Sequence, residues 1–286
     1  MIVGAGNFRY RVVEGWGQGA EGRAFGGVIP SVAVDSQDRV YLARRTPPAI
    51  LVYDRQGRFL NEWGADILHS PHSVWISPQD QVYIADMDDH TVRLFTPAGQ
   101  LLKTWGTEGQ AGEPGLPFNK PTWAVVSPAG ELFVSDGYGQ YHVHRFAADG
   151  SLLRSWGEQG PGPGQFGLPH GIRIDPRGRV LLVDREPNHR IQLFDVEGQF
   201  LGEWGGLSGP NDAFIDQEGN VFVAEGGHRI SVLNLEGKLL ARWGERGDAP
   251  GQFASSPHGI WADSRGDLYV TEVPQLADRV QKFERI

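Results

Sequence analysis

The sequence predicts an all-β protein, a six-bladed β-propeller in a single domain that spans residues 1–286. Trp-Gly occurs six times, at intervals of 39 to 51 residues, and begins at Trp16, Trp63, Trp105, Trp156, Trp204 and Trp243. Self-similarity at such a period indicates a repeat architecture. Each repeat contains four short apolar runs separated by turn residues, and no helix-period segment lies between them. Four short strands per repeat are typical of one propeller blade.

The predicted strands follow the same order in every repeat. The first strand starts at a Pro and runs to an Asp or Ser, in 30–35, 71–77, 121–127, 169–175, 210–216 and 257–263. A turn leads to a second apolar strand, in 40–43, 82–85, 132–135, 180–183, 221–224 and 268–271. A third, alternating strand follows, for example 50–53 and 191–194, and a fourth ends in Trp-Gly, for example 59–63 and 101–105.

The two ends of the chain predict how the ring closes. The last repeat stops at Ile286, after its third strand, while residues 10–17 read as a fourth strand with no blade before it. We therefore expect the N-terminal strand to complete the last blade. Such closure removes an exposed sheet edge.

Composition narrows the class of function. The chain has 40 Gly, no Cys and a net charge of −9, while 40% of its residues are hydrophobic and 10% aromatic. The apolar content argues against disorder, and the missing Cys excludes disulfides and thiolate metal sites. The acidic balance argues against nucleic acid as a partner. Without an apolar stretch of roughly 18 residues or a signal-peptide pattern, we expect a cytoplasmic protein with no membrane partner. The oligomeric state stays open.

Three histidines form a pattern at the start of the blades. The residue after the first Pro is Ser31, His72, Thr122, His170, Asn211 and His258 in the six repeats. Since first strands line the channel of a propeller, His72, His170 and His258 are expected 120° apart around the axis. Catalytic zinc takes three protein ligands and keeps a fourth position open. The sequence thus predicts a metal site, zinc by preference, with iron, cobalt or manganese also suited to three histidines.

The residue after the second strand supplies another candidate. Five repeats carry an acid there, which we expect to cap a turn and pair with basic residues of the next strand: Asp86, Asp136, Asp184, Glu225 and Glu272. Arg44 stands at this position in the first repeat. A cation among anions suggests recognition of an anionic or carbonyl group, for which Arg is well suited.

The repeats resemble the NHL-repeat family of propellers. The features that carry the resemblance are the Pro-x-Gly-Ile/Val start, the acid after the second strand, the turn at 188–191 and the Trp-Gly end. The resemblance covers nearly the whole chain. It implies the propeller fold, while its members include enzymes, receptors and protein-binding scaffolds.

Three further segments resemble the catalytic domain of the peptidyl-α-hydroxyglycine α-amidating lyase family: 133–138, 183–192 and 168–170. The resemblance implies a zinc enzyme that cleaves a carbinolamide to an amide and glyoxylate. It implies zinc on His72, His170 and His258, Tyr138 as the catalytic Tyr, and Arg44 and Arg185 as an Arg pair. Arg45, which is adjacent to Arg44, is a neighbouring possibility for that match. The expected substrate is a small or peptide-like molecule.

One family feature is missing, and other functions stay open. The family has an acid associated with calcium after its third zinc His, whereas Gly259 follows His258 here, which argues against calcium at that place. The same apparatus could activate water for hydrolysis or hydration. A non-catalytic propeller that binds a protein partner is an alternative. A lactonase-like propeller hydrolase is another, although it would need the acidic ring to point toward the axis.

Overall fold

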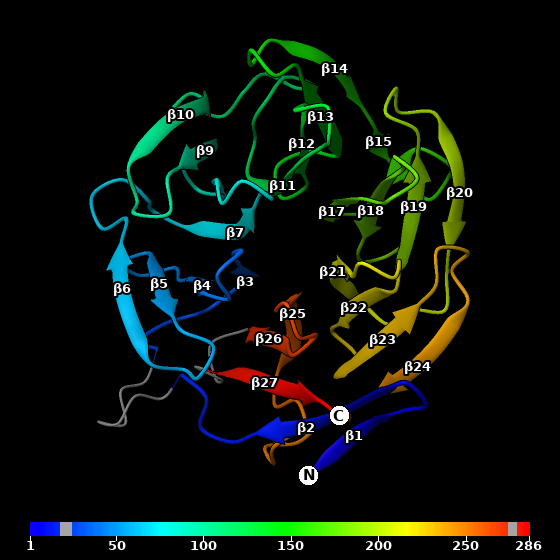
Figure 1. The fold of residues 1–286 in the computed structure, drawn as a ribbon. Coiled ribbons are helices and arrows are strands. Elements are labelled where there is room, and N and C mark those ends of the chain that lie inside the picture. The colour runs from blue at the N-terminus through cyan, green and yellow to red at the C-terminus, as the bar shows by residue number, and fades with distance from the viewer. Residues whose placement is uncertain (18–24, 274–278) are drawn as a thin grey trace.

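The computed structural model describes residues 1–17, 25–273 and 279–286, and it confirms the six-bladed propeller. Six antiparallel sheets are arranged radially around a central axis (Figure 1). Both termini lie on the same blade (Figure 1). Within the described ranges, no helix is long and apolar enough to cross a membrane.

The blades share one strand order, from the axis outward. The first strands are β3 (Ser31–Val34), β7 (Pro71–Ile76), β11 (Pro121–Val126), β17 (Pro169–Ile174), β21 (Pro210–Ile215) and β25 (Ser256–Ala262). The second strands are β4 (Val40–Ala43), β8 (Val82–Asp86), β12 (Leu132–Asp136), β18 (Val180–Asp184), β22 (Val221–Glu225) and β26 (Leu268–Val273). The third strands are β5 (Ile50–Tyr53), β9 (Thr91–Phe95), β13 (His142–Phe146), β19 (Arg190–Phe194), β23 (Arg229–Leu233) and β27 (Val280–Arg285). The fourth strands are β6 (Phe59–Trp63), β10 (Leu101–Gly106), β14 (Leu152–Trp156), β20 (Phe200–Trp204), β24 (Leu239–Trp243) and β2 (Phe8–Val13).

Burial decreases from the axis to the rim. All six residues of β7 and all five residues of β8 are buried, because both faces of these strands pack against neighbouring blades. In β6 only the final Trp63 is buried. This gradient explains why first and second strands read as continuous apolar runs, while fourth strands carry polar residues.

The Trp residues of the Trp-Gly pairs contact turns of neighbouring blades. Gly99, in the turn before the fourth strand of blade two, has φ of +87°, and a Cβ there would lie 2.7 Å from the indole of Trp63 on blade one. The same close approach pairs Gly57 with Trp16, Gly150 with Trp105, Gly198 with Trp156 and Gly237 with Trp204. Five of the 40 Gly residues are therefore required where an indole of one blade packs against a turn of the next.

The N-terminal strand closes the ring as expected. Strand β2 pairs antiparallel with β27, with Tyr10 opposite Arg285 and Val13 opposite Lys282. Tyr10 also stacks on Trp243 of blade five, with ring centroids 5.3 Å apart. An additional outer strand, β1 (Ile2–Ala5), pairs with β2. The sequence pattern did not predict β1, because it lies outside the repeat.

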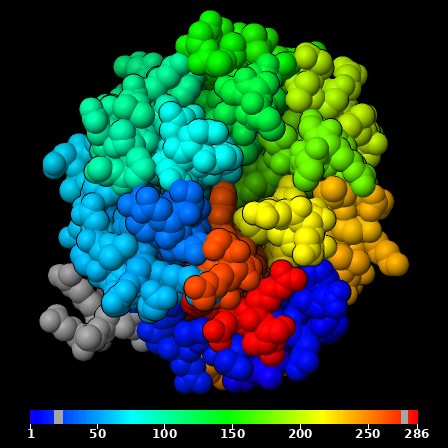
Figure 2. Space-filling model, in the orientation of Figure 1, coloured from blue at the N-terminus to red at the C-terminus, as the bar shows by residue number. Residues whose placement is uncertain are grey.

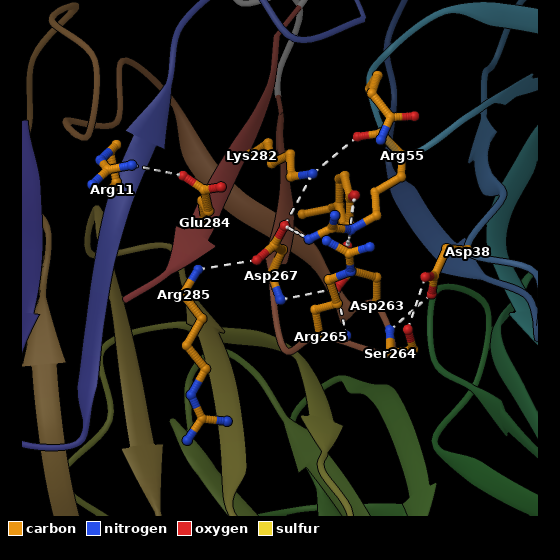
Figure 3. A network of polar contacts seen from close by, with 12 residues as sticks. Arg11, Asp38, Arg55, Asp263, Ser264, Arg265, Asp267, Lys282, Glu284 and Arg285 are labelled. Atoms are coloured by element: carbon orange, nitrogen blue, oxygen red, sulfur yellow. Dashed lines mark hydrogen bonds and ion pairs between the residues drawn. The ribbon is translucent and has the colours of Figure 1, made fainter.

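A network of buried charges joins blade one to blade six at the closure (Figure 3). Arg55 Nε of blade one donates to Asp263 Oδ2 at 2.7 Å, and its Nη2 contacts Asp267. Lys282 Nζ lies 3.1 Å from Asp267 and donates to the Arg55 carbonyl at 2.9 Å. The first and last repeats are thus joined by ion pairs as well as by strand pairing.

Arg55→Ala is expected to lower the free energy of unfolding by about 3 kcal/mol, because it leaves two carboxylates buried with less compensating charge. Arg11→Ala is the matched control. Arg11 and Glu284 form an exposed pair within blade six that contributes less than about 1 kcal/mol. Urea denaturation of both variants measures the difference. Equal losses would contradict the role given to Arg55.

Candidate metal centre

Each of the three predicted histidines lies at a break in the pairing of a first strand. In blade two, Pro71 pairs with Asp86 and Ser73 with Ala85, so that His72 between them is unpaired. His170 and His258 lie in the corresponding breaks of β17 and β25. Such bulges redirect a side chain, and here they turn all three imidazoles toward the axis.

The three imidazoles meet in one buried cluster. Their ring centroids are 4.8, 4.8 and 5.1 Å apart, and ligand nitrogens of all three residues lie within 4.8 Å of one another. All three side chains are buried. Alternate blades therefore bring His72, His170 and His258 together, as their spacing in the sequence predicts.

The intervening blades fix how each imidazole is oriented. The Nδ1 atoms of His72, His170 and His258 lie 2.9, 2.6 and 2.6 Å from the carbonyl oxygens of Thr122, Asn211 and Pro30. Since a carbonyl oxygen only accepts, each Nδ1 carries the hydrogen and each Nε2 presents a lone pair. A second partner of this kind is what orients metal-binding histidines.

Blade one corrects one detail of the predicted alignment. Ser31 pairs directly with Ala43, without the break seen in blade two. Because β3 has one residue fewer at its start, the residue equivalent to His72 is Pro30, not Ser31. The Pro30 carbonyl accordingly accepts the bond from His258.

Burial keeps the cluster neutral. Burial, His258 and the charges of Arg45 and Arg185 hold the pKa of His72 well below the ordinary value. Burial, the Arg185 charge and the other two histidines hold the pKa of His170 well below the ordinary value in the same way. Burial and the Arg185 charge lower the pKa of His258 to about 3. Neutral imidazoles are the form that binds metals.

Tyr138 reaches the cluster from the neighbouring blade. Its hydroxyl lies 3.2 Å from Nε2 of His72 and 3.3 Å from Nε2 of His170. Gly137 permits this approach, because a Cβ there would lie 1.9 Å from the carbonyl oxygen of Pro169. One hydroxyl donates only one hydrogen, so at least two of the three Nε2 lone pairs remain open to a cation.

Arg185 joins the same site. Its Nη1 donates to the Tyr138 hydroxyl at 3.2 Å, and its Nε and Nη2 both contact the Glu186 carboxylate at 2.9 Å. Glu186 thus holds the guanidinium with two parallel bonds. The structure brings Tyr138 and Arg185 to the histidines, as the resemblance implied.

The structure does not bring Arg44 to the cluster. Its guanidinium is buried and donates to the backbone carbonyls of Phe25, Thr46 and Pro48. Arg45, unlike Arg44, carries a charge that lowers the pKa of His72 and His258, and its buried Nε has no hydrogen-bond partner among the described residues. Arg45 and Arg185 each directly follow the position after the second strand, which is Arg44 in blade one and Asp184 in blade four. They therefore stand at equivalent positions on opposite blades.

The five acids that follow the second strands hold the segments before the first strands in place. Each acid accepts the backbone N–H of a residue just before its own first strand, as Asp86 does from Ser70 at 2.7 Å and Asp184 from Gly167 at 2.8 Å. Each also pairs with a base near the third strand: Arg93, His144, Arg190, Arg229 and Arg279. The pairing with basic residues was predicted, and the structure adds that all five acids are buried. These contacts occupy the five carboxylates within their own blades. A lactonase-type site would instead require carboxylates that point toward the axis.

Trp123 forms the floor of the cluster, and sequence reasoning did not identify it. Its ring centroid lies 5.2, 5.1 and 5.8 Å from those of His72, His170 and His258. Trp123 pairs with Ser135 and directly follows Thr122, which is the residue at the break equivalent to those of the histidines. Its place directly after the aligned position Thr122 was the available signal. Glu186 and the Pro30 carbonyl were also missed, since neither stands out by residue type.

One other set of ligand atoms among the described residues offers less to a cation. A group of His69, Asp86 and Asp89 exists, but Arg93 already pairs with both carboxylates.

At Gly259, a Cβ would lie 2.8 Å from the Cα of Ser31, so the backbone of blade one fills the place where the family carries its acid.

The channel has a second mouth at the other end of the first strands. A cavity of about 1190 Å³ opens there, lined by strand ends and turns that include Trp75, Phe214 and Trp261. The space-filling view shows the surface hollowed between the blades at the centre of the ring (Figure 2). The histidine cluster and this cavity lie at opposite ends of the first strands.

Comparison with known proteins supports the repeat family. The family model of the NHL repeat matches residues 166–194, which include His170 and Arg185. This chain carries an NHL repeat. The mouse NHL repeat-containing protein 3 is 31% identical over 180 residues, which cover 58% of this chain and 51% of that protein. The mouse peptidyl-glycine alpha-amidating monooxygenase is 39% identical over 62 residues, 20% of this chain and 6% of that protein. The chain thus spans at most about half the length of these relatives.

Solved structures support the fold of the NHL-repeat propeller. A catalytically inactive virginiamycin B lyase from Staphylococcus aureus with quinupristin has a TM-score of 0.63 at 14% identity, covering 99% of this chain and 89% of that chain. A gluconolactonase from Xanthomonas campestris has a TM-score of 0.66 at 13% identity, covering 90% and 86%. At these identities the similarity concerns the fold alone.

The buried histidines predict a pH dependence for the metal-free protein. Below about pH 6.5 the unfolded chain protonates its histidines while the folded cluster does not, so the free energy of unfolding falls as the pH is lowered. His258→Gln is expected to make this decline shallower by about 1.4 kcal/mol per pH unit between pH 6 and 4. Urea denaturation at several pH values measures both slopes. Parallel curves for wild type and variant would contradict a depressed pKa at His258.

Proposed function

We propose that the protein is a zinc-dependent lyase that cleaves the carbon–nitrogen bond of a carbinolamide, an α-hydroxyglycine-like substrate. The observation that carries the proposal is the convergence of three Nε2 lone pairs on the axis beside the Tyr138 hydroxyl, with Arg185 on that hydroxyl. The 39% identity to an amidating monooxygenase over 62 residues supports the same chemistry.

His72, His170 and His258 would hold the metal. Three neutral imidazoles with their Nδ1 hydrogens committed to carbonyls form a donor set suited to zinc, which in catalytic sites keeps one position for a substrate or water. When bound, zinc supplies a Lewis acid that lowers the pKa of a hydroxyl group.

Tyr138 is the proposed base. Its oxygen takes the proton of the substrate hydroxyl, the electrons of that O–H bond form the carbonyl of glyoxylate, and the carbon–nitrogen bond breaks. The electron pair of the carbon–nitrogen bond goes to the nitrogen, which takes the proton from Tyr138 and leaves as an amide. Arg185, held by Glu186, positions the Tyr138 oxygen for this transfer.

Arg45 is proposed to bind the substrate carboxylate, the role first considered for Arg44. Arg45 is half-buried and places its charge near His72 and His258 from the blade opposite Arg185. Two cations around the cluster favour an anionic group close to the reacting carbon. The guanidinium of Arg44 serves the backbone instead.

Tyr138→Phe is expected to lower kcat for the cleavage of α-hydroxyhippurate by 10²-fold or more, because the proton of the substrate hydroxyl loses its acceptor. The assay measures glyoxylate released by zinc-loaded protein. Tyr83→Phe is the control, since Tyr83 lines the cavity at the other mouth. Full turnover by Tyr138→Phe would eliminate the proposed base. Wild-type protein that holds no stoichiometric zinc, iron or cobalt would favour a non-catalytic binding propeller.

Arg45→Met is expected to raise KM for α-hydroxyhippurate about tenfold, because a charge-assisted hydrogen bond to the carboxylate is lost. The methyl ester of the same substrate lacks that charge, and its KM should change little. Arg265→Met, at an exposed Arg beside the other mouth, is the control. An equal rise in KM for acid and ester would contradict carboxylate binding by Arg45.

A further inference from the structure

A buried ion pair lies beneath the floor of the histidine cluster and has no part in the reaction proposed above. Arg173 Nη2 lies 2.6 Å from Asp212 Oδ1, and the two residues are 5% and 0% exposed. Arg173 follows His170 by three residues on β17. Asp212, on β21, is adjacent to Asn211, whose carbonyl accepts the Nδ1 hydrogen of His170.

The carboxylate of Asp212 links three successive blades. Its Oδ1 accepts the backbone N–H of Ala213 at 2.8 Å and faces Arg173 of blade four. Its Oδ2 accepts the backbone N–H of Ile260 on blade six at 3.2 Å, two residues after His258. One carboxylate therefore contacts both strands that carry His170 and His258.

The guanidinium of Arg173 lies between two indoles on the axis. Its Cζ is 5.9 Å from the ring centroid of Trp123 and 5.6 Å from that of Trp261. Trp123 in turn contacts all three imidazoles. Contacts thus run from the histidines through Trp123 and Arg173 to Trp261, which lines the cavity at the other mouth.

Stability does not account for charges at this place. Burying two ions costs desolvation energy, and apolar residues of similar volume often serve a core as well or better. What a buried pair adds is a fixed geometry, since each partner holds the other at one position and orientation. Here that geometry sets where two histidine-bearing strands and the floor of the cluster lie.

We propose that Arg173 and Asp212 are positioning residues for the metal centre. The pair holds the strands of His170 and His258 at the separation that a metal ion requires, and it keeps Trp123 against the three rings. This inference rests on the proposed function in one respect, namely that the cluster binds zinc.

Zinc affinity of the full chain, measured by competition with a chromophoric chelator, tests the proposal. Asp212→Asn is expected to weaken zinc binding about 10- to 100-fold, as loss of a residue that orients metal ligands does. The matched control is Asp263→Asn, which removes a carboxylate from the buried pair with Arg55 at the other mouth. It should lower stability and leave zinc affinity unchanged.

A second variant covers the case in which Asp212→Asn does not fold. Arg173→Met combined with Asp212→Leu replaces the pair by apolar side chains, which a core tolerates, and its zinc affinity should also fall at least tenfold. Wild-type zinc affinity in either folded variant would overturn the positioning role. The proposed function fails separately, if the wild-type protein itself does not bind zinc.

Discussion

The geometry of the candidate metal centre depends on three hydrogen bonds that cross from one blade to the next. In each, the Nδ1 of a histidine donates to the carbonyl of the equivalent residue in the following blade: Thr122, Asn211 and Pro30. Histidine-bearing blades and carbonyl-bearing blades therefore alternate around the ring. A six-fold fold thereby gains a three-fold site, with every Nε2 lone pair directed inward.

The remaining parts of the structure hold that ring of bonds in place. The buried acids fasten the segment before each first strand, as Asp86 and Asp184 illustrate. The indoles packed under neighbouring turns keep adjacent blades in contact. Arg55 and strand β2 join the last blade to the first, so that Pro30 meets His258 across the closure.

The fold and most of the site could be predicted from the sequence, because both follow from repetition. The Trp-Gly period gave the blades, and the register of His72, His170 and His258 placed them on alternate first strands. Arg44 shows the limit, since its residue type set it apart but its side chain binds backbone carbonyls, while the charge of Arg45 is the one that lowers the pKa of His258. Contacts between blades, such as Trp123 under the histidines or Ile260 on Asp212, depend on three-dimensional packing that no spacing in one repeat records.

A crystal of the zinc-loaded protein, measured at the zinc absorption edge, tests the account most directly. We expect one anomalous peak on the axis, about 2.0 to 2.1 Å from Nε2 of His72, His170 and His258. A peak held instead by His69 and Asp89, or no peak among the three imidazoles, would contradict it.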